Sequence, residues 1–126
     1  MRDFFIDALL QYCNTTITMG ATRTDLHPEK FNELGTALQA LGHPARLRII
    51  DILIKKKECM GHLLVDELGL AQPTVHQHLK RLKEAGLIQG NIDGNRVCYC
   101  IDADALNELR ESLKVFLDRP IAQNCC

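Results

Sequence analysis

The stretch from Cys59 to Ile101 narrows the possible folds most, because its apolar residues change their spacing midway along it. At first they recur at helical intervals, and Val75, Leu79 and Leu82 form one apolar stripe. Further along, a pair of β-prone runs flanks Asp93-Gly94, a dipeptide typical of tight hairpin turns. The sequence therefore predicts helices that are followed directly by a β-hairpin.

Amphipathic segments on both sides extend this pattern. In the segment over 45–54 we expect Leu47 and Ile50 to face inward and Arg46 and Arg48 to face outward. The helices predicted from the apolar spacing cover residues 4–13, 28–41, 45–54, 59–68, 72–85 and 104–117.

The order of these elements is that of a winged helix-turn-helix, a mainly α-helical fold with a β-hairpin wing. With 126 residues, the chain is long enough for one domain with a proper core. We expect an N-terminal helix and linker over 1–26 that act as a dimerisation arm. The winged helix-turn-helix domain is predicted over 27–119, and a flexible cysteine-containing tail over 120–126. The apolar stripes of the two terminal helices exceed what one small core covers, which favours a dimer.

The net charge of −1 hides an uneven distribution. Between residues 44 and 100 there are nine Lys or Arg against six Asp or Glu, whereas the flanks hold six basic and ten acidic residues. A basic middle suits a surface that binds phosphates. No apolar run approaches the roughly 20 residues of a membrane span. Asp3 and Asp7 interrupt the N-terminal apolar stretch, so we expect no secretory signal, no membrane partner and a cytoplasmic location.

The helix predicted over 72–85 has the composition of a helix that reads DNA. In a helix-turn-helix the second helix lies in the major groove, where Gln72 can pair with adenine and Thr74 can contact thymine. Composition alone favours an ordinary solvated face, but the preceding turn, the following hairpin and the scarcity of acidic residues reverse that preference. Lys80 and Arg81 suit phosphates, which position a protein without specifying sequence. The predicted DNA-binding residues are Gln72, Thr74, Val75, Gln77, His78, Lys80, Arg81 and Arg96, of which Val75 also belongs to the apolar stripe.

Three segments, ALQALGHPARLRIIDIL, LGLAQPTVHQHLKRLKEAGLI and GNRVCYCI, together closely resemble the ArsR/SmtB family of winged-helix repressors. The resemblance covers about residues 31–117, with the motifs in the family's order. It implies a homodimer that pairs through its first and last helices and binds a palindromic double-stranded DNA operator. It also implies release of that operator when an inducer, often a metal or metalloid ion, binds. One departure is Ala71, where such proteins usually carry a serine as the helix N-cap.

The resemblance does not extend to the family's ion sites. Its arsenic-sensing members place three cysteines on the helix before the recognition helix, at positions that hold Met60, His62 and Val65 here. Its zinc-sensing member uses Asp and His on the last helix, and the segment over 104–117 has no His. An inducer ion would have to bind elsewhere on this chain.

Six cysteines without a secretion signal favour metal binding or thiol chemistry over a disulfide framework. If Val97, Tyr99 and Ile101 face the core, Cys98 and Cys100 both point outward, with Cβ atoms roughly 6.5–7 Å apart. That spacing suits a shared soft ion better than a disulfide between these two residues. The candidate metal ligands are Cys59, Cys98, Cys100, Cys125 and Cys126, and the candidate ions are arsenite, Cd, Zn and Cu(I).

Three alternatives stay open. A redox-sensing repressor would oxidise an exposed thiol, and Lys55–Lys57 would favour the reactive thiolate form of Cys59. A thiol-rich metal-binding module on the same fold would bind soft ions but not DNA. An enzyme would need Cys59 and His62, three residues apart on the predicted helix, as nucleophile and base. No oxyanion hole or third orienting group accompanies them, so we expect neither catalysis nor an organic cofactor.

Overall fold

The computed structural model describes residues 24–93 and 96–123 and confirms a mainly helical fold with one antiparallel hairpin. The helix predicted over 4–13, Cys125 and Cys126 lie outside the described residues. The hairpin strands pair in register from Ile88↔Ile101 to Asp93↔Arg96. The elements are η1 (Thr24–Leu26), α2 (Glu29–Leu41), α3 (Pro44–Lys56), α4 (Leu63–Leu68), α5 (Gln72–Glu84), β1 (Ile88–Asp93), β2 (Arg96–Ile101) and α6 (Ala103–Leu117).

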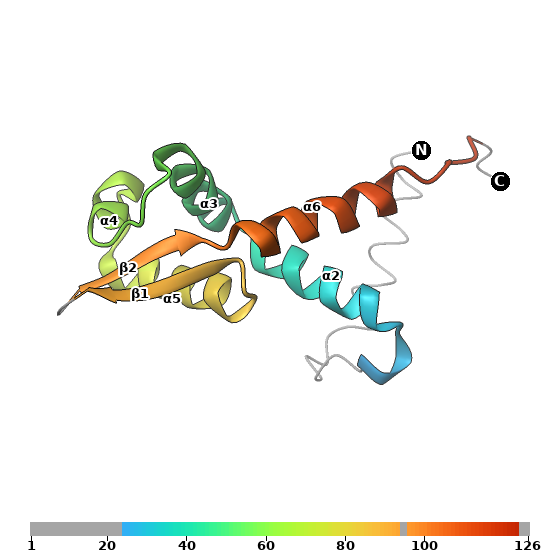
Figure 1. The fold of residues 1–126 in the computed structure, drawn as a ribbon, viewed down its shortest axis with the longest axis horizontal. Helices are drawn as coiled ribbons and strands as arrows, with labels where there is room; N and C mark the ends of the chain where they lie inside the picture. The colour runs from blue at the N-terminus through green and yellow to red at the C-terminus, as the bar shows by residue number, and fades with distance from the viewer. Residues whose placement is uncertain (1–23, 94–95, 124–126) are drawn as a thin grey trace, which may run out of the picture.

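The described elements fall into a body and two arms. Figure 1 shows α3, α4, α5 and the hairpin gathered at one end, while α2 and α6 extend away from them and diverge. The two arms contact each other, and α2 also contacts α3 and α5. None of the helices in the described residues is long and apolar enough to cross a membrane.

The apolar stripe of α5 lies in the core, as the sequence predicts. Val75, Leu79 and Leu82 are 1%, 3% and 0% exposed, and the same cluster contains Ile49 of α3 and Leu64 of α4, both fully buried. Burial of each such side chain contributes about 1.5–3 kcal/mol relative to leaving it in water. This packing determines which side of α5 remains open to a partner.

The prediction for α3 is confirmed for Ile50, which is buried, and for Arg48, which is exposed, but it is wrong for Leu47 and Arg46. Leu47 is 53% exposed, because it lies two residues before the fully buried Ile49 and therefore on the opposite side of the helix. Arg46 falls on the inward side instead and is half-buried. Its guanidinium donates hydrogen bonds to the carbonyl groups of Ala40 and Gln39 at the end of α2. The buried apolar residues of α3 are Ile49, Ile50, Ile52 and Leu53.

Arg48 does face outward, but it also binds a helix end. Its guanidinium donates to the carbonyl oxygens of Glu67 at 2.9 Å and Leu68 at 3.3 Å. The last carbonyls of a helix lack partners within the helix, so a cation there satisfies them and opposes the helix dipole. Arg48, one of the basic residues counted between residues 44 and 100, therefore stabilises the fold through these carbonyl groups.

The helix predicted over 59–68 begins four residues late, at Leu63. Among the residues before it, Met60 forms an isolated antiparallel bridge with Tyr99 of β2. The Met60 N–H donates to the Tyr99 carbonyl at 2.9 Å, and the Tyr99 N–H donates to the Met60 carbonyl at 2.8 Å. Met60 is 5% exposed. A helix does not begin at Cys59, because Met60 gains these two bonds and buries its side chain, which a first helical turn would forgo.

Helix α5 begins without a side-chain cap, since Ala71 occupies its N-cap position in an extended conformation. We expect Ala71→Ser to raise the free energy of unfolding by about 0.5–2 kcal/mol, because the hydroxyl would accept a hydrogen bond from a free N–H of the first turn. Urea unfolding followed by circular dichroism measures this change. Ala71→Val, which adds bulk without an acceptor, is the control, and a gain of equal size in both variants would contradict the capping explanation.

Candidate nucleic-acid interface and cysteine cluster

The turn between α4 and α5 presents the start of α5 to solvent. Gly69 ends α4 with φ 65°, a left-handed conformation that glycine adopts without strain. Beyond Leu70 and Ala71, α5 starts at Gln72, and Gln72, Thr74 and Gln77 are all exposed. Amide and hydroxyl side chains at the start of an open helix can reach the edges of bases in a major groove.

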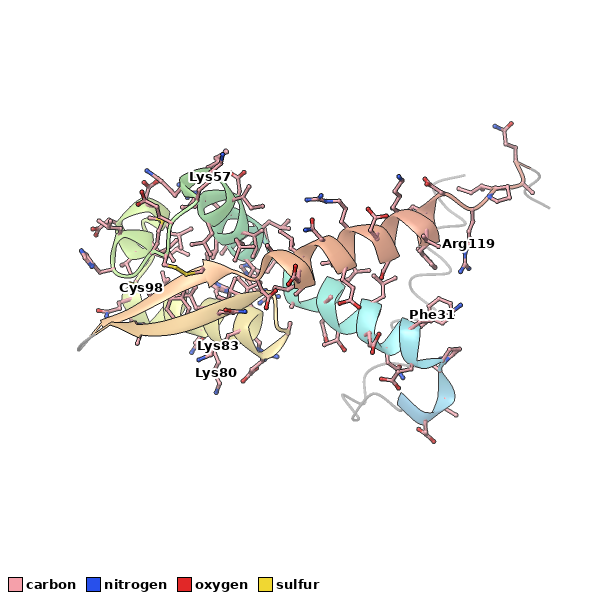
Figure 2. The ribbon with its side chains drawn as sticks, viewed as in Figure 1. Phe31, Lys57, Lys80, Lys83, Cys98 and Arg119 are labelled. Carbon is pink, nitrogen blue, oxygen red and sulfur yellow. A yellow bond between two sulfur atoms is a disulfide. The ribbon has the colours of Figure 1, made fainter. Side chains whose placement is uncertain are left out.

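Basic side chains continue this surface toward the end of α5. Lys80 and Arg81 are exposed, and Lys80 lies 3.9 Å from Glu84 in a solvent-exposed ion pair that contributes little energy. Figure 2 shows Lys80 and Lys83 projecting from α5. Arg96 begins β2 beside the hairpin turn, and its side chain lies outside the described portion of the structure. The exposed face of α5 thus combines neutral hydrogen-bonding groups at its start with cations near its end.

Among the residues predicted to contact DNA, one lies in the core and another is partly enclosed by a neighbouring ring. Val75 is in the core at 1% exposure, so it supports α5 from inside. The half-buried His78 packs against His43, with ring centroids 4.5 Å apart. His43 in turn caps α3, because its Nδ1 accepts a hydrogen bond from the Ala45 N–H at 3.1 Å. Partial burial, together with His43 and Arg46, lowers the pKa of His78 below its ordinary value of 6.5. His78 therefore joins α5 to α3.

A disulfide joins Cys59, in the segment before α4, to Cys100 on β2, with the two Cα atoms 4.4 Å apart. Its position follows from the pairing of Met60 with Tyr99. Met60 and Tyr99 exchange both backbone hydrogen bonds, so the adjacent pair, Cys59 and Cys100, is of the type that forms no hydrogen bonds with each other. In such pairs the Cα atoms approach to about 4.5 Å. Figure 2 shows this bond in yellow near the labelled Cys98.

Cys98 is the cysteine in the described residues that is not in a disulfide, and it is half-buried. It lies opposite Gly61 across the same pairing, and a Cβ atom added to Gly61 would be 4.0 Å from the Cys98 Sγ. Because Cys98 and Cys100 are two apart on a strand, their side chains share one face with Cys59.

Val97, which the sequence places toward the core, is instead 42% exposed, while Tyr99 packs against the core as expected.

The described residues, in which Cys59 and Cys100 are joined by the disulfide, contain no group of three or more His, Cys, Asp or Glu side chains able to hold a metal ion. The sequence placed Cys59 on a helix, whereas the structure places it before α4, next to the Met60–Tyr99 bridge. Neither the Cys59–Cys100 bond nor the His43–His78 contact was predicted. No local pattern signals them, because both pairs are far apart in the sequence and meet only through tertiary packing.

A helix-turn-helix with an exposed second helix, followed by a hairpin, defines a DNA-binding transcriptional regulator of the winged type. The family model for bacterial regulatory proteins of the arsR family matches residues 43–89. An HTH-type transcriptional regulator of Mycobacterium tuberculosis (strain CDC 1551 / Oshkosh) is 33% identical over 84 residues, which cover 67% of this chain and 74% of that relative. The chain belongs to the ArsR family.

Two further relatives agree with this assignment. The arsenical resistance operon repressor of Staphylococcus xylosus is 31% identical over 85 residues, which cover 68% of this chain and 81% of the repressor. The crystal structure of NolR from Sinorhizobium fredii superposes with a TM-score of 0.58 at 26% identity, covering 81% of this chain and all of that one (100%). These similarities extend beyond the α4–α5 motif to most of the described fold.

The His43–His78 contact predicts a specific pH dependence of stability. The unfolded state, with an ordinary histidine pKa of 6.5, binds a proton more readily than the folded state, in which the pKa of His78 is lower. Stability should therefore be unaffected by His78 well above pH 6.5 and should fall as the pH drops through and below that value. We expect His78→Gln to reduce this loss between pH 7.5 and pH 5.5.

The measurement is the free energy of urea unfolding at both pH values. His76→Gln serves as the control, because His76 is exposed on the same helix. A loss of stability at low pH that is identical in wild type and His78→Gln would show that His78 does not cause it.

Proposed function

We propose that the chain is a homodimeric transcriptional repressor that binds a palindromic operator through α5 and releases it when cysteine thiolates bind a soft metal or metalloid ion. The observation that carries DNA binding is the exposed face of α5, with Gln72, Thr74 and Gln77 at its start and Lys80 and Arg81 near its end. It would act in the cytoplasm, where it meets DNA.

The two ends of this face have different roles in the proposal. Gln72 and Thr74 read bases, because the first turn of the recognition helix lies deepest in the major groove. Lys80 and Arg81 bind phosphates, since they lie two turns further along, where the helix leaves the groove. Arg96, at the tip of the wing, adds a contact to the backbone or to the neighbouring minor groove. Val75 and His78 support the helix from behind.

Apolar residues left exposed on α2 and α6 support a dimer. Val115, Phe116 and Leu117 are 67%, 41% and 61% exposed, and the Phe116 ring meets Phe31 of α2 edge to face, with centroids 6.3 Å apart. A groove of about 520 Å³ lies between the two helices. A second copy that packs on α2 and α6 would cover these side chains. A two-fold dimer presents two copies of α5, which explains why a palindromic site is expected.

The choice of a soft ion rests on the cysteines and on one relative. Thiolates prefer arsenite, Cd, Zn or Cu(I) to hard ions, and the Staphylococcus xylosus relative is named an arsenical resistance operon repressor. The Cys59–Cys100 disulfide favours a second candidate, a repressor that senses oxidants through its thiols. A metal-binding module without DNA binding is disfavoured, because the hydrogen-bonding and basic face of α5 would then have no use.

Substitutions on α5 separate base reading from phosphate binding. We expect Gln72→Ala and Thr74→Ala to relax base preference at one operator position each, at about 1–3 kcal/mol per lost contact. Lys80→Ala should weaken binding to all sequences alike and lower the slope of log affinity against log salt by about 1. Fluorescence anisotropy with operator variants at several salt concentrations measures both effects. Lys114→Ala on α6 is the control, and unchanged base preference after both Gln72 and Thr74 are replaced would remove α5 from this role.

The proposed dimer interface predicts a change of mass in solution. Phe116→Asp should convert the proposed dimer to a monomer, because it replaces an aromatic contact with a strongly hydrated carboxylate that is costly to bury between α2 and α6 of two copies. Sedimentation equilibrium measures the mass, and circular dichroism checks that the fold persists. Leu63→Asp, at a residue that is 53% exposed on α4, is the matched control. A dimer that survives Phe116→Asp would place the interface elsewhere.

A further inference from the structure

Four residues form a square on one face of the paired segments before α4 and in β2. Cys59 lies opposite Cys100, and Gly61 lies opposite Cys98, because Met60 pairs with Tyr99 between them. Directly opposite residues share a face of a sheet, and so do residues two apart on a strand. Three corners of the square are therefore cysteines, contributed by two segments that are distant in the sequence.

The fourth corner is a glycine, at a close approach of the two segments. A Cβ at Gly61 would lie 3.0 Å from the Val97 carbonyl oxygen and 4.0 Å from the Cys98 Sγ. A side chain there would press against the Val97 carbonyl and lie beside the Cys98 sulfur atom. Glycine therefore lets the two segments approach closely at this corner.

We propose that Cys59, Cys98 and Cys100 form one effector site with two exclusive states, a three-thiolate site for a trivalent arsenic or similar soft ion when reduced, and the Cys59–Cys100 disulfide when oxidised. This proposal rests on the proposed function and names the site and its control. With arsenite, three thiols condense with As(OH)3, so that three S–H and three As–O bonds break and three As–S bonds and three water molecules form. Opening the disulfide requires two electrons and two protons from a dithiol reductant, which becomes a disulfide in turn.

The two states differ in geometry at a sensitive place. Sulfur atoms in a disulfide are about 2.05 Å apart, whereas two thiolates on one ion with metal–sulfur bonds of about 2.3 Å lie roughly 3.5–4 Å apart. Exchange of one state for the other therefore changes the separation of the sulfur atoms between the segment of Cys59 and β2. That segment leads directly into α4, the first helix of the helix-turn-helix, and β2 is a strand of the wing. The site thus lies at the junction between α4 and the wing.

The test uses the full-length chain with Cys13, Cys125 and Cys126 replaced by serine, so that the three cysteines of the square remain. Sodium arsenite is added to the reduced protein without DNA, bound arsenic is measured by equilibrium dialysis, and free thiols are counted with Ellman's reagent. We expect one arsenic per chain and the loss of three thiols. The peroxide-oxidised protein should bind none until a dithiol reductant is added.

Single variants then assign the ligands. Cys98→Ser should weaken arsenite binding at least tenfold yet still form the disulfide, whereas Cys59→Ser and Cys100→Ser should lose both. Loss of arsenite binding in the starting triple variant, equal affinity in Cys98→Ser, or undiminished binding by the oxidised protein would each overturn the proposal.

Operator binding by the reduced, arsenic-free protein is measured separately by anisotropy. If DNA binds but arsenite does not use the square, this inference fails and the repressor proposal stands. If arsenite binds the square but no DNA binds, the repressor proposal fails and the effector site remains.

Discussion

Burial of one side of α5 sets the arrangement of the other described elements. Val75, Leu79 and Leu82 enter a core shared with α3 and α4, and no other side of α5 carries a comparable stripe. Because these side chains must leave water, the opposite face must stay exposed, with Gln72 at its start. Burial of this apolar stripe therefore also orients the surface that is proposed to bind DNA. The His43–His78 contact adds a second attachment on the same inner side.

A second constraint attaches the wing to this core. Two hydrogen bonds join Met60 to Tyr99, so that Met60 lies beside the hairpin as a single paired residue. The Met60 side chain is buried there. As a result, Cys59 and Cys100 are held at a distance that permits a disulfide, and Cys98 lies on the same face. The effector site that we propose at these sulfur atoms would therefore act at the link between the wing and the helix-turn-helix.

Much of the fold could be predicted from the sequence, because the spacing of apolar residues within most helices and strands indicates their type. The stripe of α5, the two paired strands of the hairpin and the last helix were predicted correctly, since amphipathic and alternating spacing are local properties. The errors occurred where a tertiary contact overrode a local preference. Leu47 was expected inside, but Arg46 takes the inward side to bind the end of α2. The helix expected from Cys59 starts at Leu63, because Met60 pairs with Tyr99 of β2 instead of entering a helix.

The candidate sites, too, were predicted in part from the sequence and in part determined by tertiary packing. The order and type of the residues were enough to identify the family, the helix that displays Gln72 and Lys80, and the supply of cysteines. Tertiary packing was needed to place Val75 and His78 on the inner side of that helix. It was also needed to bring Cys59 to Cys100 across the Met60–Tyr99 pair. The reason is that strand register between segments distant in the sequence depends on how the whole core packs, which no local pattern encodes.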